Sequence, residues 1–315
     1  MTRFAQTLGL PLVLFLLLAA APLWADTFTL SLLARAMIFA LAAISLDLIL
    51  GGAGLVSFGH AALMGIGAYG VGILMAEGVS EALIAFPVAM AAAGLFALAT
   101  GALSLKTRGV YFIMITLAFG QMAFFVAQSL SAYGGDDGLS LAARSLVAGE
   151  RWLRGPLAFH YTVLGLLAAG ALLCGALLAA PFGRVLRAAK DNERRVRALG
   201  LDPYPYRLVA YGIAGALAGL SGALFANLTE FVSPAFLSWH RSGELIVMVV
   251  AGGMAAAALK AGGLGRPGSA LLGALLVVLL EEALSDLTEH WRIVFGPLLV
   301  LLVLAGGKRA RGGRT

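Results

Sequence analysis

Charged side chains are scarce in this chain. Asp, Glu, Lys and Arg make up only 12% of its 315 residues, whereas a soluble domain carries about 25%. Apolar residues make up 61% of the chain, and the mean hydropathy is +0.95. This composition excludes a water-soluble globule and indicates a protein that spends most of its length in a membrane.

Cysteine and the common catalytic motifs are also missing or nearly so. The single Cys174 lies in an apolar run, so the chain has no disulfide framework and no cysteine metal site. No His-x-x-x-His pair, Gly-x-Ser-x-Gly elbow or Gly-x-x-x-x-Gly-Lys-Ser/Thr phosphate loop occurs. We therefore expect no enzyme activity, no metal and no cofactor bound by this chain. If ATP drives its function, the ATP is expected on a partner subunit.

Negative charge is the scarcer of the two signs, with 16 Asp and Glu against 22 Lys and Arg, a net charge of +6. In a soluble chain this excess would suggest nucleic acid. In a membrane protein, Lys and Arg instead mark the cytoplasmic ends of helices. We predict the lipid bilayer as the surrounding partner and no nucleic acid.

Long apolar runs fill most of the chain. A membrane helix needs about 20 apolar residues, and the sequence contains ten such runs: 8–24, 28–50, 59–75, 82–104, 109–130, 160–180, 207–228, 243–258, 268–285 and 291–306. They predict an all-α polytopic membrane protein, a single transmembrane domain over 1–315 with about ten transmembrane helices. Two assignments stay open. The first run resembles a signal peptide as well as an uncleaved span, and 243–258 is short enough to be re-entrant.

The positive charges predict the orientation of these spans. The segment 181–207 carries seven Lys or Arg, and the tail 308–314 carries four. Placing both in the cytoplasm puts the N and C termini in the cytoplasm and the loop 131–159 outside. The exception to the rule is that this outer loop carries three arginines, namely Arg144, Arg151 and Arg154.

Polar residues in or beside the apolar runs are candidates for a solute path. We predict that several of five such residues line a central cavity: Ser57, His60, Tyr69, Thr116 and Gln121. For Ser57 and Thr116, hydrogen bonds to the preceding helical turn are an equal alternative. The glycines at 51, 52 and 54 come just before this group, so the backbone there could be unwound along a polar cavity or could form a close-packed turn.

Other intramembrane features favour helix packing. Glycines recur at helical spacing on one stripe, at positions 212, 215, 219 and 222, which is typical of a face where two helix backbones approach closely. Arg35 and Asp47 are twelve residues apart, about 18 Å along a helix, too far to pair with each other. Each therefore needs a partner on another helix or a wet cavity.

The segment 184–199 predicts a short amphipathic helix outside the membrane. An apolar stripe recurs every three or four residues, namely Val185, Ala189, Asn192, Val196 and Leu199, and the other face is charged. Gly200 suits the residue that follows a helix. Such a helix can lie on the membrane surface or dock a cytoplasmic partner.

Several motifs resemble one family of permeases. The loop with Asn192-Glu193 and Ala198-Leu199-Gly200 resembles the coupling segment of LivM-type permeases from bacterial branched-chain amino-acid ABC importers. Other stretches similar to the family follow in the family's order, at 54–69, 105–120, 135–140, 214–224, 231–234 and 248–253. The resemblance covers roughly residues 35–305. The chain departs from the family pattern at Gln121, where Glu is frequent, and over 254–268, which is longer and rich in Ala and Gly.

The resemblance implies a permease domain over 1–315, in the bacterial inner membrane, with a coupling segment at 181–207. The partners it implies are a paralogous permease subunit, two cytoplasmic ATPase subunits and a periplasmic solute-binding protein. The residues expected to contact the ATPase are Arg184, Arg187, Asn192, Glu193, Arg194 and Gly200. Branched-chain amino acids are the leading substrate, with urea, amides or aromatic acids as alternatives. The rival class is an ion-coupled secondary transporter, for which Asp47 is the single candidate acid.

Overall fold

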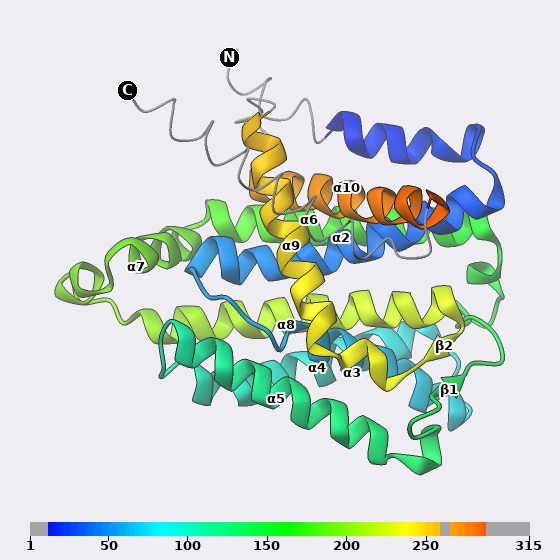
Figure 1. Cartoon of the computed structure of the whole chain (residues 1–315), viewed down its shortest axis with the longest axis horizontal. Coiled ribbons are helices and arrows are strands. Elements are labelled where there is room, and N and C mark those ends of the chain that lie inside the picture. The colour runs from blue at the N-terminus through cyan, green and yellow to red at the C-terminus, as the bar shows by residue number, and fades with distance from the viewer. Residues whose placement is uncertain (1–11, 259–264, 288–315) are drawn as a thin grey trace.

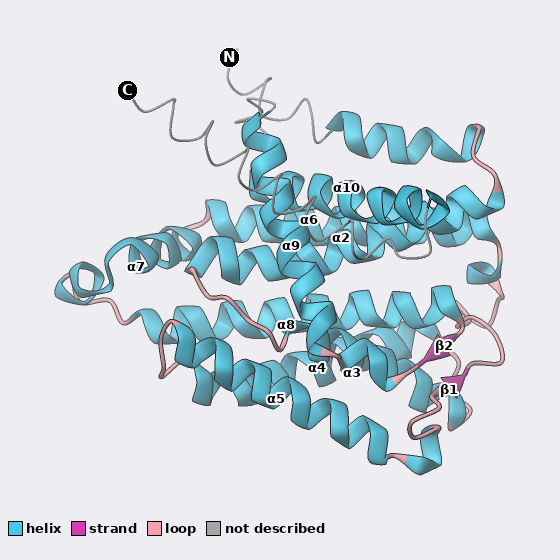
Figure 2. Ribbon diagram, in the orientation of Figure 1, coloured by secondary structure: helices cyan, strands magenta, loops and turns pink. Residues whose placement is uncertain are grey.

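The structure, a computed structural model, describes residues 12–258 and 265–287 (Figure 1). Its helices are α2 (Thr27–Ala53), α3 (His60–Ala76), α4 (Ala82–Ser104), α5 (Val110–Ser129), α6 (Pro156–Ala179), α7 (Pro181–Ala198), α8 (Pro203–Thr229), α9 (Trp239–Ala258) and α10 (Gly265–Leu287). Two short antiparallel strands, β1 (Leu139–Ser140) and β2 (Phe231–Val232), pair in the register Leu139↔Val232. Figure 2 shows how completely helices dominate, which confirms the all-α prediction for the described part.

Six of the predicted spans are confirmed as helices long and apolar enough to cross a membrane. They are α2, α4, α5, α6, α8 and the stretch Gly268–Ser285 of α10. Two shorter apolar helices, Leu12–Leu23 and α3, match two further runs. The predicted span 291–306 lies outside the described residues. The total of ten spans and the cytoplasmic placement of both termini therefore stay predictions.

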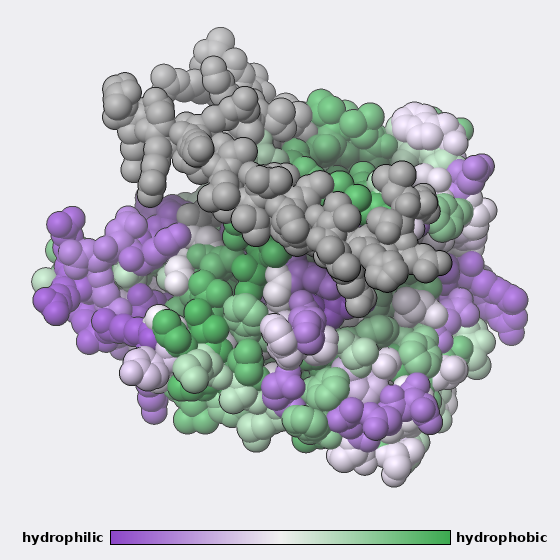
Figure 3. All heavy atoms as spheres, in the orientation of Figure 1, coloured by the Kyte–Doolittle hydropathy of each residue, from purple (hydrophilic) through white to green (hydrophobic). Residues whose placement is uncertain are grey.

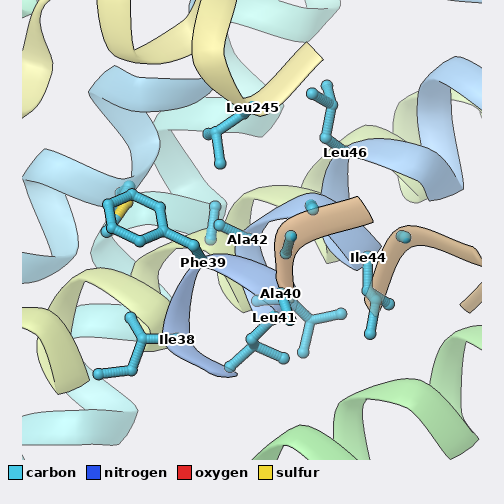
Figure 4. Packing of buried hydrophobic residues seen from close by; sticks show 14 of the residues in the cluster. Ile38, Phe39, Ala40, Leu41, Ala42, Ile44, Leu46 and Leu245 are labelled. Carbon is cyan, nitrogen blue, oxygen red and sulfur yellow. The ribbon is translucent and has the colours of Figure 1, made fainter. Parts of the chain in front are cut away.

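The helix α2 lies at the centre of the bundle. In its most apolar stretch 83% of the residues are buried, against 22% for α5. Figure 4 shows side chains from Ile38 to Leu46 pointing away from α2 in several directions, with Leu245 of α9 facing them. A helix that is hydrophobic on all sides suits either a protein core or a lipid environment, and α2 lies in the core. The less buried faces of α4, α5 and α6 are left for lipid or for another subunit.

Small residues allow α8 to pack closely on its neighbours. A Cβ added at Gly222 would lie 1.7 Å from the carbonyl oxygen of Met64 on α3. A Cβ at Gly219 would lie 2.6 Å from the Cβ of Ala93 on α4. Without a hydrophobic driving force between helices in lipid, such close backbone approach supplies the packing contacts. The glycine stripe of α8 is therefore a packing face, as predicted.

One charged side chain of α2 finds its partner on another helix. The Nη2 atom of Arg35 lies 3.1 Å from Oε1 of Glu281 on α10. This ion pair confirms the expectation that Arg35 pairs across the bundle. The other charged residue, Asp47, is buried, with 7% of its surface exposed.

Two helices, α3 and α9, begin between the two ends of the bundle rather than at one of them (Figure 1). Residues 54–59 after α2 are not helical, and this segment leads into the interior, where α3 starts at the fully buried His60 (Figure 1). The helix α9 crosses the others obliquely in the same view and starts at Trp239, four residues before the predicted 243. Gly54 adopts a left-handed conformation, with φ of 74°, where α2 stops. Gly51 and Gly52 remain helical within α2, and the non-helical backbone begins only at Gly54. A polar cavity along this segment stays a prediction.

The bundle has two polar ends. The α7 end consists of α7 with the loop 105–109, which an ion pair between Arg108 and Glu193 holds together. The sheet end consists of β1, β2 and the loop 131–155, which pairs with the chain before α4 through Glu81↔Leu146. Figure 3 shows hydrophilic side chains gathered at both ends, with much of the surface between them hydrophobic. This distribution is the one expected of a protein that crosses a bilayer.

Candidate functional site

Three of the five predicted path residues meet where α3 begins. The Oγ1 atom of Thr116 accepts a hydrogen bond from the backbone N–H of Phe58 at 3.3 Å. The Oγ atom of Ser57 accepts one from the N–H of Gly59, also at 3.3 Å. The Nε2 atom of His60 lies 2.8 Å from the Oγ atom of Ser45. These side chains come from α2, the segment 54–59, the first residue of α3 and α5, so the fold gathers them from separate stretches of the sequence.

Side chains replace helical hydrogen bonds in this break. The Oγ atom of Ser242, on the first turn of α9, accepts from the N–H of Ala61 at 3.0 Å. Buried backbone N–H groups need a partner when no water is present, which explains why hydroxyl side chains surround irregular backbone here. Ser57, His60 and Thr116 are each at most 1% exposed. In this conformation they lie in closed contacts between helices, and their role in a solute path stays a prediction.

The hydrogen bonds around the start of α3 do not include the other two residues, Tyr69 and Gln121. Tyr69 lines a groove of about 590 Å³ between α4 and α5, whose other lining side chains are almost all apolar. Within the described residues, neither the Tyr69 hydroxyl nor the Gln121 Nε2 atom has a hydrogen-bond partner, although both atoms are buried. The structure therefore brings together three of the five residues. Within the described ranges, Nδ1 of His60 also lacks a hydrogen-bond partner, like the polar atoms of Tyr69 and Gln121.

Sequence reasoning missed the partners of this cluster. Ser45 and Ser242 make the hydrogen bonds just described, and the Tyr211 hydroxyl lies 3.4 Å from Oγ of Ser57. All three are polar residues in apolar helices, which is the signal that could have selected them. What the sequence could not supply is the pairing, because Tyr211 is 154 residues away from Ser57.

The predicted amphipathic helix is present as α7, but it is not continuous. Asn192 has φ of −156° and ψ of 95°, which is extended backbone between two helical halves. Its Oδ1 atom accepts a hydrogen bond from the N–H of Arg195 at 3.0 Å. This is how an N-cap residue begins a new helix. The prediction of one uninterrupted helix over 184–199 is corrected accordingly.

The buried face of α7 also differs from the predicted stripe. Ala189 and Val196 are buried as expected, but Asn192 is exposed and Leu199 is 74% exposed. The other buried residues of α7 are Gly183 and Leu186, which do not belong to the predicted stripe. The kink at Asn192 rotates the second half of the helix, so a stripe drawn on one continuous helix does not hold. Gly200 follows the helix in a left-handed conformation, φ 81°, as predicted.

Two long side chains attach α7 to the ends of other helices. The Nζ atom of Lys190 donates to the carbonyl oxygen of Gly51 in the last turn of α2, at 3.2 Å. An Nη atom of Arg187 donates to the carbonyl oxygen of Leu178 in the last turn of α6, at 2.7 Å. Cations at helix C-termini satisfy free carbonyl groups and complement the helix dipole. Arg187 therefore contacts its own chain.

Glu193 lies at the centre of an ion cluster. Its carboxylate oxygens are 2.7 Å from Arg108, 2.9 Å from Arg197 and 3.0 Å from Arg207. The side chain is only 12% exposed. The cluster joins α7 to the loop after α4 and to α8. In contrast, Arg184 and Arg194 are exposed, and in the part of the chain that the structure describes neither makes an ion pair.

The described residues also contain no candidate metal centre. Over 12–258 and 265–287, no group of three or more His, Cys, Asp or Glu side chains is placed to hold a metal ion.

Comparison with known proteins gives a consistent result. Residues 28–303 match the sequence model of the family described as the permease component of branched-chain amino acid transport systems. The chain is 29% identical to the high-affinity branched-chain amino acid transport permease LivM of Escherichia coli K12, over 93% of this chain and 72% of that protein. It is 27% identical to LivM of Salmonella typhimurium over the same shares. The autoinducer 2 import permease LsrC of Enterobacter is 29% identical over 80% of this chain and 71% of that protein.

Proposed function

The chain belongs to the family of permease components of branched-chain amino acid transport systems, and on this premise we propose that it is one of two pore-forming subunits of an ATP-driven importer. The other pore subunit is a paralogous permease. Two cytoplasmic ATPase subunits bind and hydrolyse ATP, and a periplasmic solute-binding protein delivers the solute. The chain itself is a transport subunit rather than an enzyme and binds no cofactor. Membership of this family disfavours an ion-coupled carrier built on Asp47.

The observation that carries this proposal is the placement of α7. The helix projects from one end of an otherwise apolar bundle (Figure 1), and it exposes Arg184, Arg194 and Leu199 while its buried face packs on the bundle. A charged helix with an exposed apolar tip is suited to docking in a groove on a soluble partner, where charge sets the orientation. We assign α7, with Gly200 after it, as the element that couples this subunit to an ATPase.

The attachments of α7 suggest how a movement there reaches the interior. Lys190 holds the end of α2, and the chain leaves α2 directly into the unwound segment 54–59, which carries Ser57 and leads to His60. When the ATPases close on ATP, displacement of α7 pulls on this connection. Rigid helices that pivot on a few irregular residues are a common way to open one side of a site and close the other. The predicted path residues, Tyr69, Thr116 and Gln121 among them, would then be exposed in turn.

Branched-chain amino acids are the proposed substrates. Support comes from the names of the LivM relatives, which match 93% of the chain. The LsrC relatives show that permeases of similar sequence serve other solutes. An importer of the same type for urea, amides or aromatic acids is therefore the second candidate. Uptake of labelled leucine by vesicles that contain all subunits and the binding protein tests the choice, with the other solutes as competitors.

We place the chain in the bacterial inner membrane as a single permease domain over 1–315, with ten spans, both termini and segment 181–207 in the cytoplasm, and loop 131–159 in the periplasm. The native Cys174 is 1% exposed, so added cysteines can be labelled against a low background. Cysteines at Asp137 and Arg195, both exposed, should react with a membrane-impermeant reagent from opposite sides. Labelling of both from one side would contradict the topology.

The proposed assembly has a direct test. Purification of the tagged chain from its own cells should bring the ATPase and the second permease with it. In reconstituted vesicles, the loaded binding protein should stimulate ATP hydrolysis and the empty one should not. A chain that transports without any ATPase, driven by an ion gradient, would refute the proposal.

A further inference from the structure

A cavity of about 630 Å³ opens at the sheet end, away from both sites described above. Its charged lining consists of all three arginines of the loop 131–159, namely Arg144, Arg151 and Arg154, together with Glu230. Its apolar lining comes from the last turns of α3 and from residues 139–146. The arginines that depart from the usual charge distribution of a membrane protein therefore share one site.

Arg144 is held firmly at this cavity. Its side chain is 15% exposed, and its guanidinium carbon lies 4.6 Å from the ring centre of Phe159. One Nη atom donates to the carbonyl oxygen of Leu153 at 3.1 Å. The Nε atom lies 3.4 Å from Oε1 of Glu230 but makes no hydrogen bond within the described structure. A fixed guanidinium with an unused buried donor is a ready partner for an incoming anion.

The other two arginines lie at a short 3-10 helix, Trp152–Arg154, which the fully buried Leu153 anchors: Arg151 is its N-cap residue and Arg154 is its last residue. In the described ranges, neither Arg151 nor Arg154 lies within 4.0 Å of a carboxylate. Three arginines face one glutamate, so the cavity carries an excess of two positive charges. Positive charge focused in a concave site attracts anions from solution.

The loop that carries the arginines is fixed to the bundle. The N–H of Ser145 donates to Oδ1 of Asn227 at 2.7 Å, and the N–H of Leu146 donates to the carbonyl oxygen of Ser80 at 2.7 Å. The β1–β2 pair holds its other side. A ligand would therefore meet a site whose backbone is already ordered, which lowers the entropic cost of binding.

We propose that this cavity is an entry site that receives an aliphatic amino acid as it leaves the binding protein. Arg144, Arg151 and Arg154 bind the carboxylate, Glu230 accepts from the ammonium group, and apolar residues including Met75 and Leu141 contact the side chain. The volume falls in the range of about 300–1,000 Å³ usual for small-molecule sites. This inference rests on the proposed function, because it names where that importer first holds its substrate.

An acidic side chain of the docked binding protein is the other carboxylate that could enter. It would use the arginines, but it would leave Glu230 and the apolar wall without a role. A zwitterion with an aliphatic side chain uses all three parts of the lining. The observations therefore favour the free amino acid.

The test uses the full transporter in vesicles. In the double variant Arg151→Gln/Arg154→Gln, labelled leucine uptake should fall about tenfold or more at limiting substrate, because two charged partners of the carboxylate are lost. The affinity of the loaded binding protein for the transporter should stay unchanged. Glu230→Gln should also lower uptake. Asp137→Asn, which changes an exposed charge of the same loop outside the cavity lining, is the matched control and should behave as wild type.

Each outcome separates this inference from the proposed function. Normal uptake by the double variant, with wild-type transport intact, would overturn the entry site and leave the proposed function standing. A parallel loss of binding-protein affinity would also overturn it, since the arginines would then serve docking. Absence of leucine uptake by the complete wild-type transporter would refute the proposed substrate, and the entry site with it.

Discussion

The two polar ends of the molecule are both rich in arginine, yet they present it in opposite ways. At the α7 end, Arg184 and Arg194 lie on the outside of a projecting helix, and the largely buried Glu193 pairs with three other arginines. At the sheet end, the arginines surround a cavity and face a single glutamate.

This difference suggests that the shape of the supporting backbone decides what the arginines recognise. A convex, charged helix fits a groove on another protein, where charge sets register more than affinity. A concave site with an unbalanced charge fits a small anion. The following predictions test whether the two ends are as distinct as this comparison says.

The largest effect should come from breaking α7. Ala189→Pro removes a helical hydrogen bond at a buried position whose carbonyl oxygen also accepts from Arg207. Proline inside a helix costs about 3 kcal/mol, so stimulation of the ATPase by loaded binding protein should fall about tenfold or more. Ala188→Ser, at the exposed neighbouring position, is the control and should couple normally. Wild-type stimulation by an assembled Ala189→Pro transporter would mean that α7 is not the coupling element.

The next effect concerns the ion cluster. The sequence analysis treats Glu193 only as a residue that contacts the ATPase, whereas the structure also gives it a role in folding. Glu193→Arg should impair folding, because four arginines would then face one another. Glu193→Gln should already lower the free energy of unfolding by about 1–3 kcal/mol, since three guanidinium groups lose a charged partner. Thermal unfolding of the purified complex measures the loss. Asp191→Asn, an exposed acid on the same helix, should leave the melting temperature unchanged; an equal shift in both variants would argue against a special role for Glu193.

A smaller effect is expected at the sheet end alone. Asn227→Ala leaves the buried N–H of Ser145 without its acceptor, which costs about 1–2 kcal/mol. Amide hydrogen exchange over 139–155 should accelerate, and leucine uptake should fall, while exchange in α7 stays as in wild type. Ser129→Ala, which removes an exposed hydroxyl bonded only within its own helix, is the matched control. Equal acceleration at both ends would show that they are not independent.

Much of the fold could be predicted because burial in lipid leaves a simple signal. The apolar run 82–104 matches α4 residue for residue, and 28–50 lies wholly within α2. The depth at which α3 and α9 begin could not be predicted. Hydropathy reports that a segment is apolar, but it does not report whether the helix starts at the membrane surface or in the middle of the bundle.

The sequence could identify single residues of the candidate sites, but it could not predict which of them contact one another. The polar residues Ser57, His60 and Thr116 stand out among apolar neighbours, and all three make their hydrogen bonds around the start of α3. The contact of Ser57 with Tyr211, and that of the Ala61 N–H with Ser242, depend on helix packing over long separations in sequence, which no local pattern encodes. Glu193 was misplaced for a similar reason. Its position on a charged helix suggested an exposed face, whereas Arg108, 85 residues away, covers it.

The smallest effect, and the sharpest contrast with the sheet end, should come from Arg194→Gln. This side chain is exposed, and within the described residues it makes no ion pair, so the melting temperature should not change. If Arg194 orients α7 on an ATPase, half-maximal activation by the binding protein should need about two- to threefold more of it, because charges at the rim of an interface contribute modestly. Added salt should shrink the difference between variant and wild type, since exposed charges are screened.

At saturating binding protein, leucine uptake by Arg194→Gln should match wild type, unlike in the Arg151→Gln/Arg154→Gln variant. A loss of uptake in Arg194→Gln that neither salt nor excess binding protein reduces would contradict a purely orienting role and would erase the distinction drawn between the two ends.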